Sequence, residues 1–204
     1  VYRGTKKAPL RHNAVQTFDE YNTGMNIGDG IPSIFLQVDG NGTDISMYVY
    51  MAGGGCTLPG AAKVLMPGEG YEGVVRFVMD RMPSYGINAC PPLLVGVGVA
   101  TSVETAALNS KLALMRRVDS ENPNANAAKL EHLIEDGINH IGLGPQGFGG
   151  QKSVMGVNVE NTARHPSTIG VAVSTGCWSH RRGLINFDAD LNYDLPLNKG
   201  VELS

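Results

Sequence analysis

The stretch NACPPLLVGVGVATSVETAA, residues 88–107, decides the fold class of this chain of 204 residues. Residues 93–97 form a short apolar run, which indicates a buried strand. Thr101 and Glu104 match the pattern of a capping box and predict a helix that continues to about residue 117. A strand that leads directly into a helix is typical of a fold in which both element types share one core.

Strand and helix patterns also occur on both sides of this stretch. Apolar patterns predict strands at 33–38, 45–52, 153–160 and 168–175, and helices at 71–82 and about 126–141. The turn-rich residues 39–42 would join the first two strands as a hairpin, Pro83 would end the first helix, and Gly142 would terminate the second. Because strands and helices do not alternate strictly, the sequence predicts an α+β fold with mixed β-sheets and packed helices.

The regular patterns predict one domain over residues 1–187, without an internal repeat. Residues 188–204 are polar and are typical of a C-terminal tail or linker. The chain begins at Val1 without an initiator methionine and without the apolar core of a signal peptide. We therefore expect a processed chain or a fragment of a longer one.

The composition is that of a globular protein, with 42% hydrophobic and 17% charged residues. The net charge of −3 argues against nucleic acid or an anionic membrane as a partner, because binding phosphates needs a surplus of Lys and Arg. No apolar run reaches the roughly 18 residues of a membrane-spanning helix.

Three cysteines, Cys56, Cys90 and Cys177, are widely spaced and lack a CxxC pattern. An odd number of widely spaced cysteines does not suit a disulfide framework and indicates a reducing cytoplasm. Scattered thiols commonly serve as small buried side chains. Cys90 precedes Pro91 and Pro92, and a cysteine immediately before proline recurs among iron–sulfur ligands. Cys177 is followed by His180, Arg181 and Arg182, cations that would favour a thiolate.

Glycine accounts for 27 residues, close to twice the usual share of about 7%. Gly96 to Thr101 follow a strand and open a helix, as in a nucleotide-binding loop, but Thr101 replaces the third glycine of that motif. Gly53 to Gly55 permit either the close approach of a ligand or a bulge at a sheet edge. Residues 142–150 contain five glycines, which is typical of an ordered functional loop.

Five segments in the order 7–15, 50–78, 88–107, 142–150 and 163–183 carry these features. Together they resemble the class I iron–sulfur hydro-lyases, which comprise the oxygen-sensitive fumarases and L(+)-tartrate dehydratase. The segments 50–78 and 163–183 are most similar to the α chains of tartrate dehydratases. The resemblance covers nearly the whole chain.

The resemblance implies a [4Fe–4S] cluster held by three cysteines, with one iron left open as a Lewis acid. Cys90 and Cys177 match two of these ligands. The third belongs to a Cys-Gln-Asp-Thr-Gly motif upstream of the segment 7–15, which is absent here. Cys56 lies where family members often carry serine, so we do not expect it to be a ligand. The domain is therefore expected to be incomplete at its N-terminus.

The resemblance also implies the substrate contacts. Arg11 matches the arginine that binds a substrate carboxylate, and His165 matches a histidine that contacts the substrate and assists proton movement. Gly54 and Gly55 match glycines whose backbone N–H groups meet the substrate. The general base is expected in a β subunit or C-terminal domain, within an α2β2 or dimeric assembly.

The expected function is dehydration of a small 2-hydroxydicarboxylate, with L(+)-tartrate giving oxaloacetate. A class I fumarase subunit, which interconverts malate and fumarate, is the alternative. Two other classes stay open at this point: a nucleotide-binding module built on Gly96 to Thr101, and a non-catalytic fragment that serves as an assembly partner.

Overall fold

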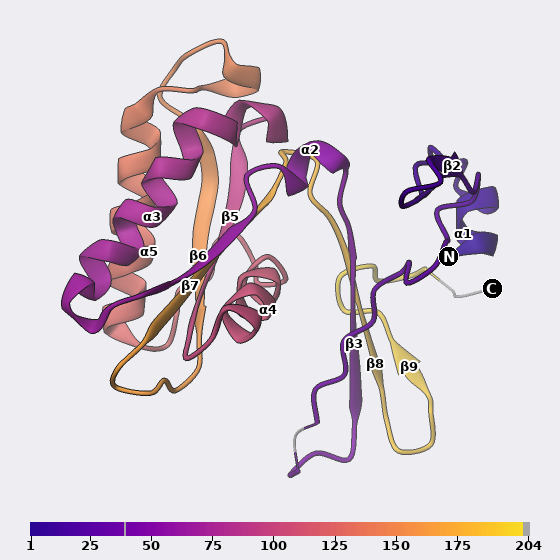
Figure 1. Cartoon of the computed structure of the whole chain (residues 1–204). Coiled ribbons are helices and arrows are strands. Elements are labelled where there is room, and N and C mark those ends of the chain that lie inside the picture. Colours follow the sequence, from indigo (N-terminus) through magenta and orange to yellow (C-terminus); the bar gives the residue numbers. More distant parts are fainter. Residues whose placement is uncertain (39, 202–204) are drawn as a thin grey trace. The chain divides into compact units, whose positions relative to one another are not determined.

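A computed structural model describes residues 1–38 and 40–201 of the chain (Figure 1). The chain divides into two compact units, Val1–Thr43 and Asp44–Ser204. No boundary near residue 43 is evident in the sequence pattern. The domain end expected at residue 187 stays a prediction, although the residues after it include a short strand, Tyr193–Asp194.

The first unit is small and held mainly by polar contacts. It contains helix α1 (Tyr2–Lys7) and a short antiparallel pair, β1 (Val15–Gln16) and β2 (Tyr21–Asn22). Thr5 is buried, and its Oγ1 donates to the backbone oxygen of Met25 at 3.3 Å. This bond holds α1 against the loop that follows β2.

The second unit is built on a four-stranded mixed sheet in the order β4-β7-β5-β6. Its strands are β4 (Ala61–Leu65), β7 (Ile169–Gly176), β5 (Leu93–Ala100) and β6 (Val154–Asn161). β5 and β6 are parallel, and the other two pairs are antiparallel. The mixed sheet with its packed helices confirms the α+β prediction. β5, β6 and β7 are the three strands predicted from their apolar runs.

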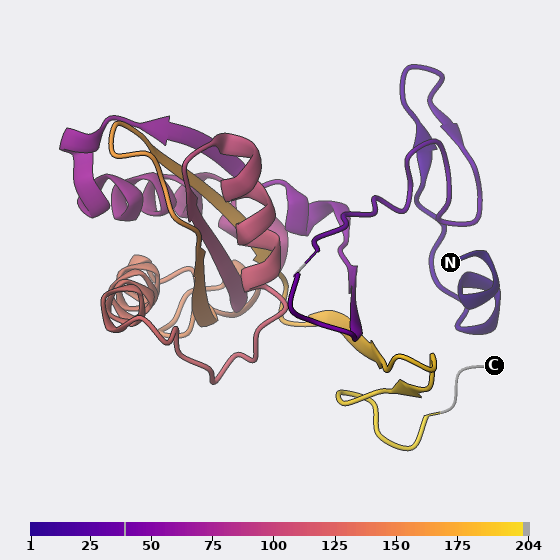
Figure 2. The same ribbon diagram turned by 90° about the horizontal axis from the view of Figure 1, so that it is seen from below.

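The main hydrophobic core lies on one face of this sheet. Helices α3 (Gly70–Tyr85) and α5 (Ala125–Ile141) cover that face, and α4 (Val103–Ala113) covers the other (Figures 1 and 2). Alternate residues of β5 and β7 meet buried side chains of the two helices. The core includes Val95, Val97, Val171, Val173, Val78, Ile134 and Ile138.

The opposite face of the sheet is lined by small residues, which let α4 approach the strands closely. A Cβ atom on Gly96 would lie 2.2 Å from the backbone oxygen of Ser110, and one on Gly98 would lie 1.9 Å from that of Ala106. Both glycines lie inside β5, not in a turn after it. Close helix packing explains them, so the nucleotide-loop interpretation of Gly96 to Thr101 is wrong.

We expect Gly98→Ala to lower the free energy of unfolding by about 1–3 kcal/mol, because the new methyl group must push α4 away from β5. Denaturant unfolding measures this change. Gly183→Ala is the matched control, since its Cβ would meet only Val49 Cβ at an ordinary 3.9 Å. Equal stability of the two variants would contradict the close packing of α4.

A second, three-stranded sheet has the order β3-β8-β9. β3 (Ile45–Met51) pairs along its whole length with β8 (Arg181–Phe187), and β9 (Tyr193–Asp194) pairs with the end of β8. The predicted hairpin is therefore wrong: the partner of β3 lies far along the chain, residues 33–38 form no strand, and Asp39 lies outside the described residues. The side chains of β3 are mostly exposed, which the half-buried alternation did not predict.

The helix boundaries also differ in detail from the prediction. Ser102, not Thr101, caps α4, which ends at Ala113, before the predicted residue 117. α3 continues past Pro83 to Tyr85. Gly142 ends α5 with a left-handed φ of +73°, as predicted. The short helical turns are α2 (Gly54–Thr57), η1 (Pro67–Glu69), η2 (Gly86–Ala89) and η3 (Pro145–Gly147).

Candidate functional site

Cys90 and Cys177 lie side by side at one end of the four-stranded sheet. Cys90 lies just before β5, and Cys177 follows directly after β7. Because these strands are antiparallel, with Leu94 opposite Gly176, the start of one meets the end of the other. The backbone N–H of Trp178 donates to the oxygen of Cys90 at 3.3 Å. The structure thus brings together the two turns that carry the predicted cluster ligands.

The turn that carries Cys90 is held by the glycine-rich loop. Cys90 is exposed and adopts a left-handed conformation with φ 57° and ψ 73°, uncommon for a residue other than glycine. The oxygen of Pro91 accepts from the backbone N–H of Gln146 at 2.8 Å. Residues 142–150 therefore support the cysteine turn, while a functional role of this loop stays a prediction.

The turn α2 packs against the same end of the sheet. A Cβ atom on Gly55 would lie 2.3 Å from the backbone oxygen of Asn88, so only glycine allows this approach. Thr175 Oγ1 donates to the oxygen of Cys56 at 2.8 Å and ties α2 to β7. Packing therefore explains the glycine at position 55. At position 54, an added Cβ atom would meet no atom within 4 Å, so packing does not require a glycine there. The contact of Gly54 and Gly55 with substrate stays a prediction.

Cys56 is buried, as expected for a structural thiol, but it also faces Cys177. Thr175, whose Oγ1 holds the Cys56 backbone oxygen, lies two residues before Cys177. Burial, followed by the nearby Cys177 sulfur, raises the pKa of Cys56. Among residues 1–38 and 40–201, no three His, Cys, Asp or Glu side chains are grouped to hold a metal ion. Cys90 and Cys177 therefore offer part of a ligand set.

Tyr50 and Lys111 border the cysteines and were missed in the sequence. Tyr50 Oη donates to the backbone oxygen of Thr175 at 3.1 Å, and burial, with smaller effects of Cys56 and Cys177, raises its pKa. The Lys111 ammonium lies 5.7 Å from the centre of the Tyr50 ring, and burial lowers its pKa. They come from β3 and α4, and no motif links these elements to the cysteines.

The basic residues after Cys177 contact the end of α4. The His180 ring lies 5.3 Å from the Tyr50 ring, and its Nε2 is 2.8 Å from the oxygen of Leu114. Burial lowers the pKa of His180. Arg182 donates to the backbone oxygens of Leu114 and Arg116. These contacts hold the start of β8 beside α4 and direct Arg182 toward carbonyl groups.

His165 lies at the other end of β7 from Cys177. It precedes Ile169, the first residue of a strand of eight residues, which spans roughly 26 Å. His165 is exposed, and its Nδ1 accepts from the backbone N–H of Ser167 at 3.1 Å. Arg164, which sequence reasoning did not single out, donates to three carbonyl oxygens of this loop. Within the second unit, His165 is thus separate from the cysteines.

Arg11 belongs to the first unit, where it is exposed between α1 and β1. Its predicted contact with substrate therefore stays a prediction.

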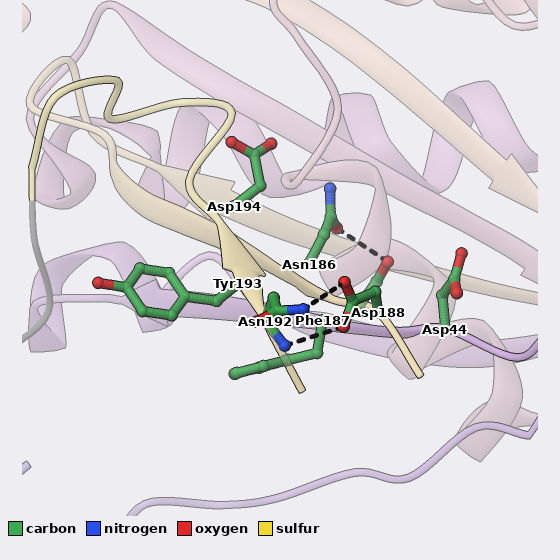
Figure 3. A pocket seen from close by; sticks show the side chains of 8 residues that line it. Asp44, Asn186, Phe187, Asp188, Asn192, Tyr193 and Asp194 are labelled. Atoms are coloured by element: carbon green, nitrogen blue, oxygen red, sulfur yellow. Dashed lines mark hydrogen bonds between the residues drawn. The ribbon is translucent and has the colours of Figure 1, made fainter. Parts of the chain in front are cut away.

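An open hollow of about 390 Å³ lies at the end of the β3-β8-β9 sheet and is lined mainly by polar side chains (Figure 3). The carboxylate of Asp188 accepts from the backbone N–H groups of Asp190 and Asn192 and from Asn192 Nδ2, at 2.9–3.0 Å. These bonds close the loop between β8 and β9. The hollow contains none of the predicted site residues.

The family of the chain follows from comparison with known proteins. A model of the family described as fumarate hydratase (Fumerase) matches residues 1–186. The chain therefore belongs to this family, which confirms the resemblance seen in the sequence. None of the helices in the described part of the chain is long and apolar enough to span a bilayer.

Individual relatives carry a more specific name. The L(+)-tartrate dehydratase subunit alpha of Escherichia coli (strain K12) is 59% identical over 194 residues, which are 95% of this chain and 64% of the relative. The protein of the same name from Shigella sonnei has the same identity and coverage. A protein of Methanocaldococcus jannaschii, provisionally given this name, is 30% identical over 94% of this chain and 68% of its own length. The chain thus spans a little under two thirds of the enterobacterial relatives.

Proposed function

We propose that this chain forms part of the α subunit of an oxygen-sensitive hydro-lyase that converts L(+)-tartrate to oxaloacetate with loss of water. The observation that carries the proposal is the pairing of Cys90 and Cys177, whose turns are joined by the bond from the Trp178 N–H to the Cys90 oxygen. The relatives from Escherichia coli and Shigella, named as tartrate dehydratase α subunits, support the choice of substrate.

Cys90 and Cys177 fit an iron–sulfur cluster. Thiolates are the usual ligands of such clusters, and these two come from adjacent turns, one exposed and one half-buried. A third cysteine would come from a part of the α subunit outside this chain. When bound, a [4Fe–4S] cluster held by three cysteines supplies an open iron that acts as a Lewis acid on a substrate oxygen.

The remaining predicted residues would bind and orient the substrate. The planar guanidinium of Arg11 suits a substrate carboxylate, and the N–H groups of Gly54 and Gly55 can donate to a second one. His165 lies at the other end of β7 from Cys177, so it would hydrogen-bond this substrate and move a proton at its hydroxyl group only from a second copy of the chain in the expected dimeric assembly. Loss of the C3 proton and the C2 hydroxyl from tartrate yields an enol, which tautomerises to oxaloacetate.

A partner must supply the base that removes the C3 proton. We expect a β subunit or C-terminal domain in this role, in an α2β2 or dimeric assembly. An oxygen-sensitive cluster and three free cysteines fit a reducing cytoplasm.

Anaerobic turnover by the holoenzyme that contains this chain tests the proposal. We expect kcat/KM for L(+)-tartrate to exceed that for L-malate by about 100-fold or more, because malate lacks the C3 hydroxyl and leaves its polar partner in the pocket unpaired. A preference for malate would instead identify a class I fumarase, the second candidate, which the description of the matched family favours. Turnover of neither substrate would contradict a hydro-lyase.

A further inference from the structure

Cys56 is a buried thiol at the site to which the proposed function gives no task. It lies in α2, and both of its backbone polar groups are hydrogen-bonded. Its N–H donates to the backbone oxygen of Gly53 at 3.0 Å, and its backbone oxygen accepts from Thr175 Oγ1 at 2.8 Å. Only 6% of the residue is exposed. Its sulfur therefore occupies a defined position beside the end of β7.

That position is against Cys177. Thr175 Oγ1 holds the Cys56 oxygen at 2.8 Å and lies two residues before Cys177, so α2 packs beside the segment that carries Cys177. The Cys177 thiol also helps to raise the pKa of Cys56, as expected for two neighbouring thiols. Cys90 meets this segment differently, through the bond from its own backbone oxygen to the Trp178 N–H, and it is exposed to solvent. Of the two possible partners of Cys177, the structure thus favours Cys56.

The two neighbouring thiols differ in access to solvent. Cys177 is half-buried, whereas Cys56 is buried. A small oxidant therefore reaches Cys177 first, and oxidation of cysteine follows exposure. Cys56 is then placed behind it as a second thiol, the arrangement of a resolving cysteine.

We propose that Cys56 and Cys177 form a reversible disulfide when the chain, without a bound cluster, meets hydrogen peroxide. The Cys177 thiolate attacks one peroxide oxygen, the O–O bond breaks, and Cys177 sulfenic acid and hydroxide result. The Cys56 thiolate then attacks the Cys177 sulfur, the S–S bond forms, and the sulfenic oxygen leaves as a second hydroxide. Two thiols are oxidised, one peroxide is reduced, and the thiol protons leave with the oxygens as two waters.

The disulfide would have two consequences at this site. It prevents oxidation of Cys177 to sulfinic acid, which is irreversible for most proteins. It also removes Cys177 as a thiolate ligand until a reductant restores it. The second consequence rests on the proposed function, whereas formation of the disulfide does not.

Peptide mapping of the full chain tests the proposal directly. Trypsin places the three cysteines in separate peptides, 12–63, 82–111 and 165–181. After peroxide treatment, alkylation of free thiols and digestion without reductant, we expect mass spectrometry to show peptides 12–63 and 165–181 joined. Dithiothreitol should release them. A link between peptides 82–111 and 165–181, or no link, would overturn the proposal.

Two variants separate the disulfide from general oxidation. In Cys56→Ser the link should be lost and sulfinic acid should accumulate at Cys177, while Cys90→Ser should keep the link. Equal sulfinic acid at Cys177 in the wild type and Cys56→Ser would contradict a protective role. Iron loading after oxidation tests the ligand role of Cys177 separately. If the disulfide forms but iron uptake is not reduced, the disulfide proposal stands and the proposed cluster site is contradicted.

Discussion

Replacing Glu131 by alanine is expected to lower the free energy of unfolding by about 3–5 kcal/mol. The Glu131 carboxylate is buried in α5, where it accepts from Arg116 and from the backbone N–H of Val159, both at 2.7 Å. It also accepts from the backbone N–H of Asn122 at 2.9 Å. Its removal leaves two backbone N–H groups without their acceptor, and Arg116 keeps only the more distant Glu160 carboxylate at 3.5 Å. Losing these buried partners costs far more than loss of an exposed ion pair.

Denaturant unfolding followed by circular dichroism measures the effect. Asp136→Ala is the matched control, because Asp136 lies on the same helix but is exposed, and we expect a change within about 0.5 kcal/mol. Glu131→Gln should lie between the two, since an amide oxygen still accepts but carries no charge. A loss below about 1 kcal/mol in Glu131→Ala would contradict the view that this carboxylate joins α5, β6 and the residues after α4.

Serine in place of Cys90 or Cys177 is expected to abolish retention of iron by the chain. Changes to groups that merely orient a metal ligand cost about 10–100-fold in metal affinity, so loss of a ligand itself should cost at least about 100-fold. Cys56→Ser is the matched control, because it removes a neighbouring thiol at the same sheet end without removing a proposed ligand.

The sequence predicted well the elements that depend on local pattern. β5, β6 and β7 are short apolar runs buried on both faces of the sheet, and α5 has both an apolar stripe and a terminal glycine. The hairpin at 33–38 failed because an apolar run does not specify its partner. Ile34 and Leu36 are in fact 86% and 89% exposed. The true partner of β3 is β8, which no local signal could indicate.

The candidate site was predictable only where a motif marks it. The contexts of Cys90 and Cys177 singled them out, and antiparallel pairing of β5 with β7 explains why they meet. Tyr50 and Lys111 reach the same place from β3 and α4, through packing that leaves no trace in residue spacing. Gly96 and Gly98 suggested a nucleotide site where the structure has only close helix packing. In sequence, a glycine that lets a helix approach a strand cannot be distinguished from one that lets a phosphate approach the backbone.

Anaerobic reconstitution with iron, sulfide and dithiothreitol tests the central claim that Cys90 and Cys177 hold an iron–sulfur cluster. Dithiothreitol supplies a free thiolate for the position that this chain does not fill. The account predicts broad visible absorbance with bound iron and sulfide in the wild type and Cys56→Ser, and neither in Cys90→Ser or Cys177→Ser. Failure of the wild type to bind iron, or loss of iron in Cys56→Ser with retention in Cys90→Ser, would contradict it.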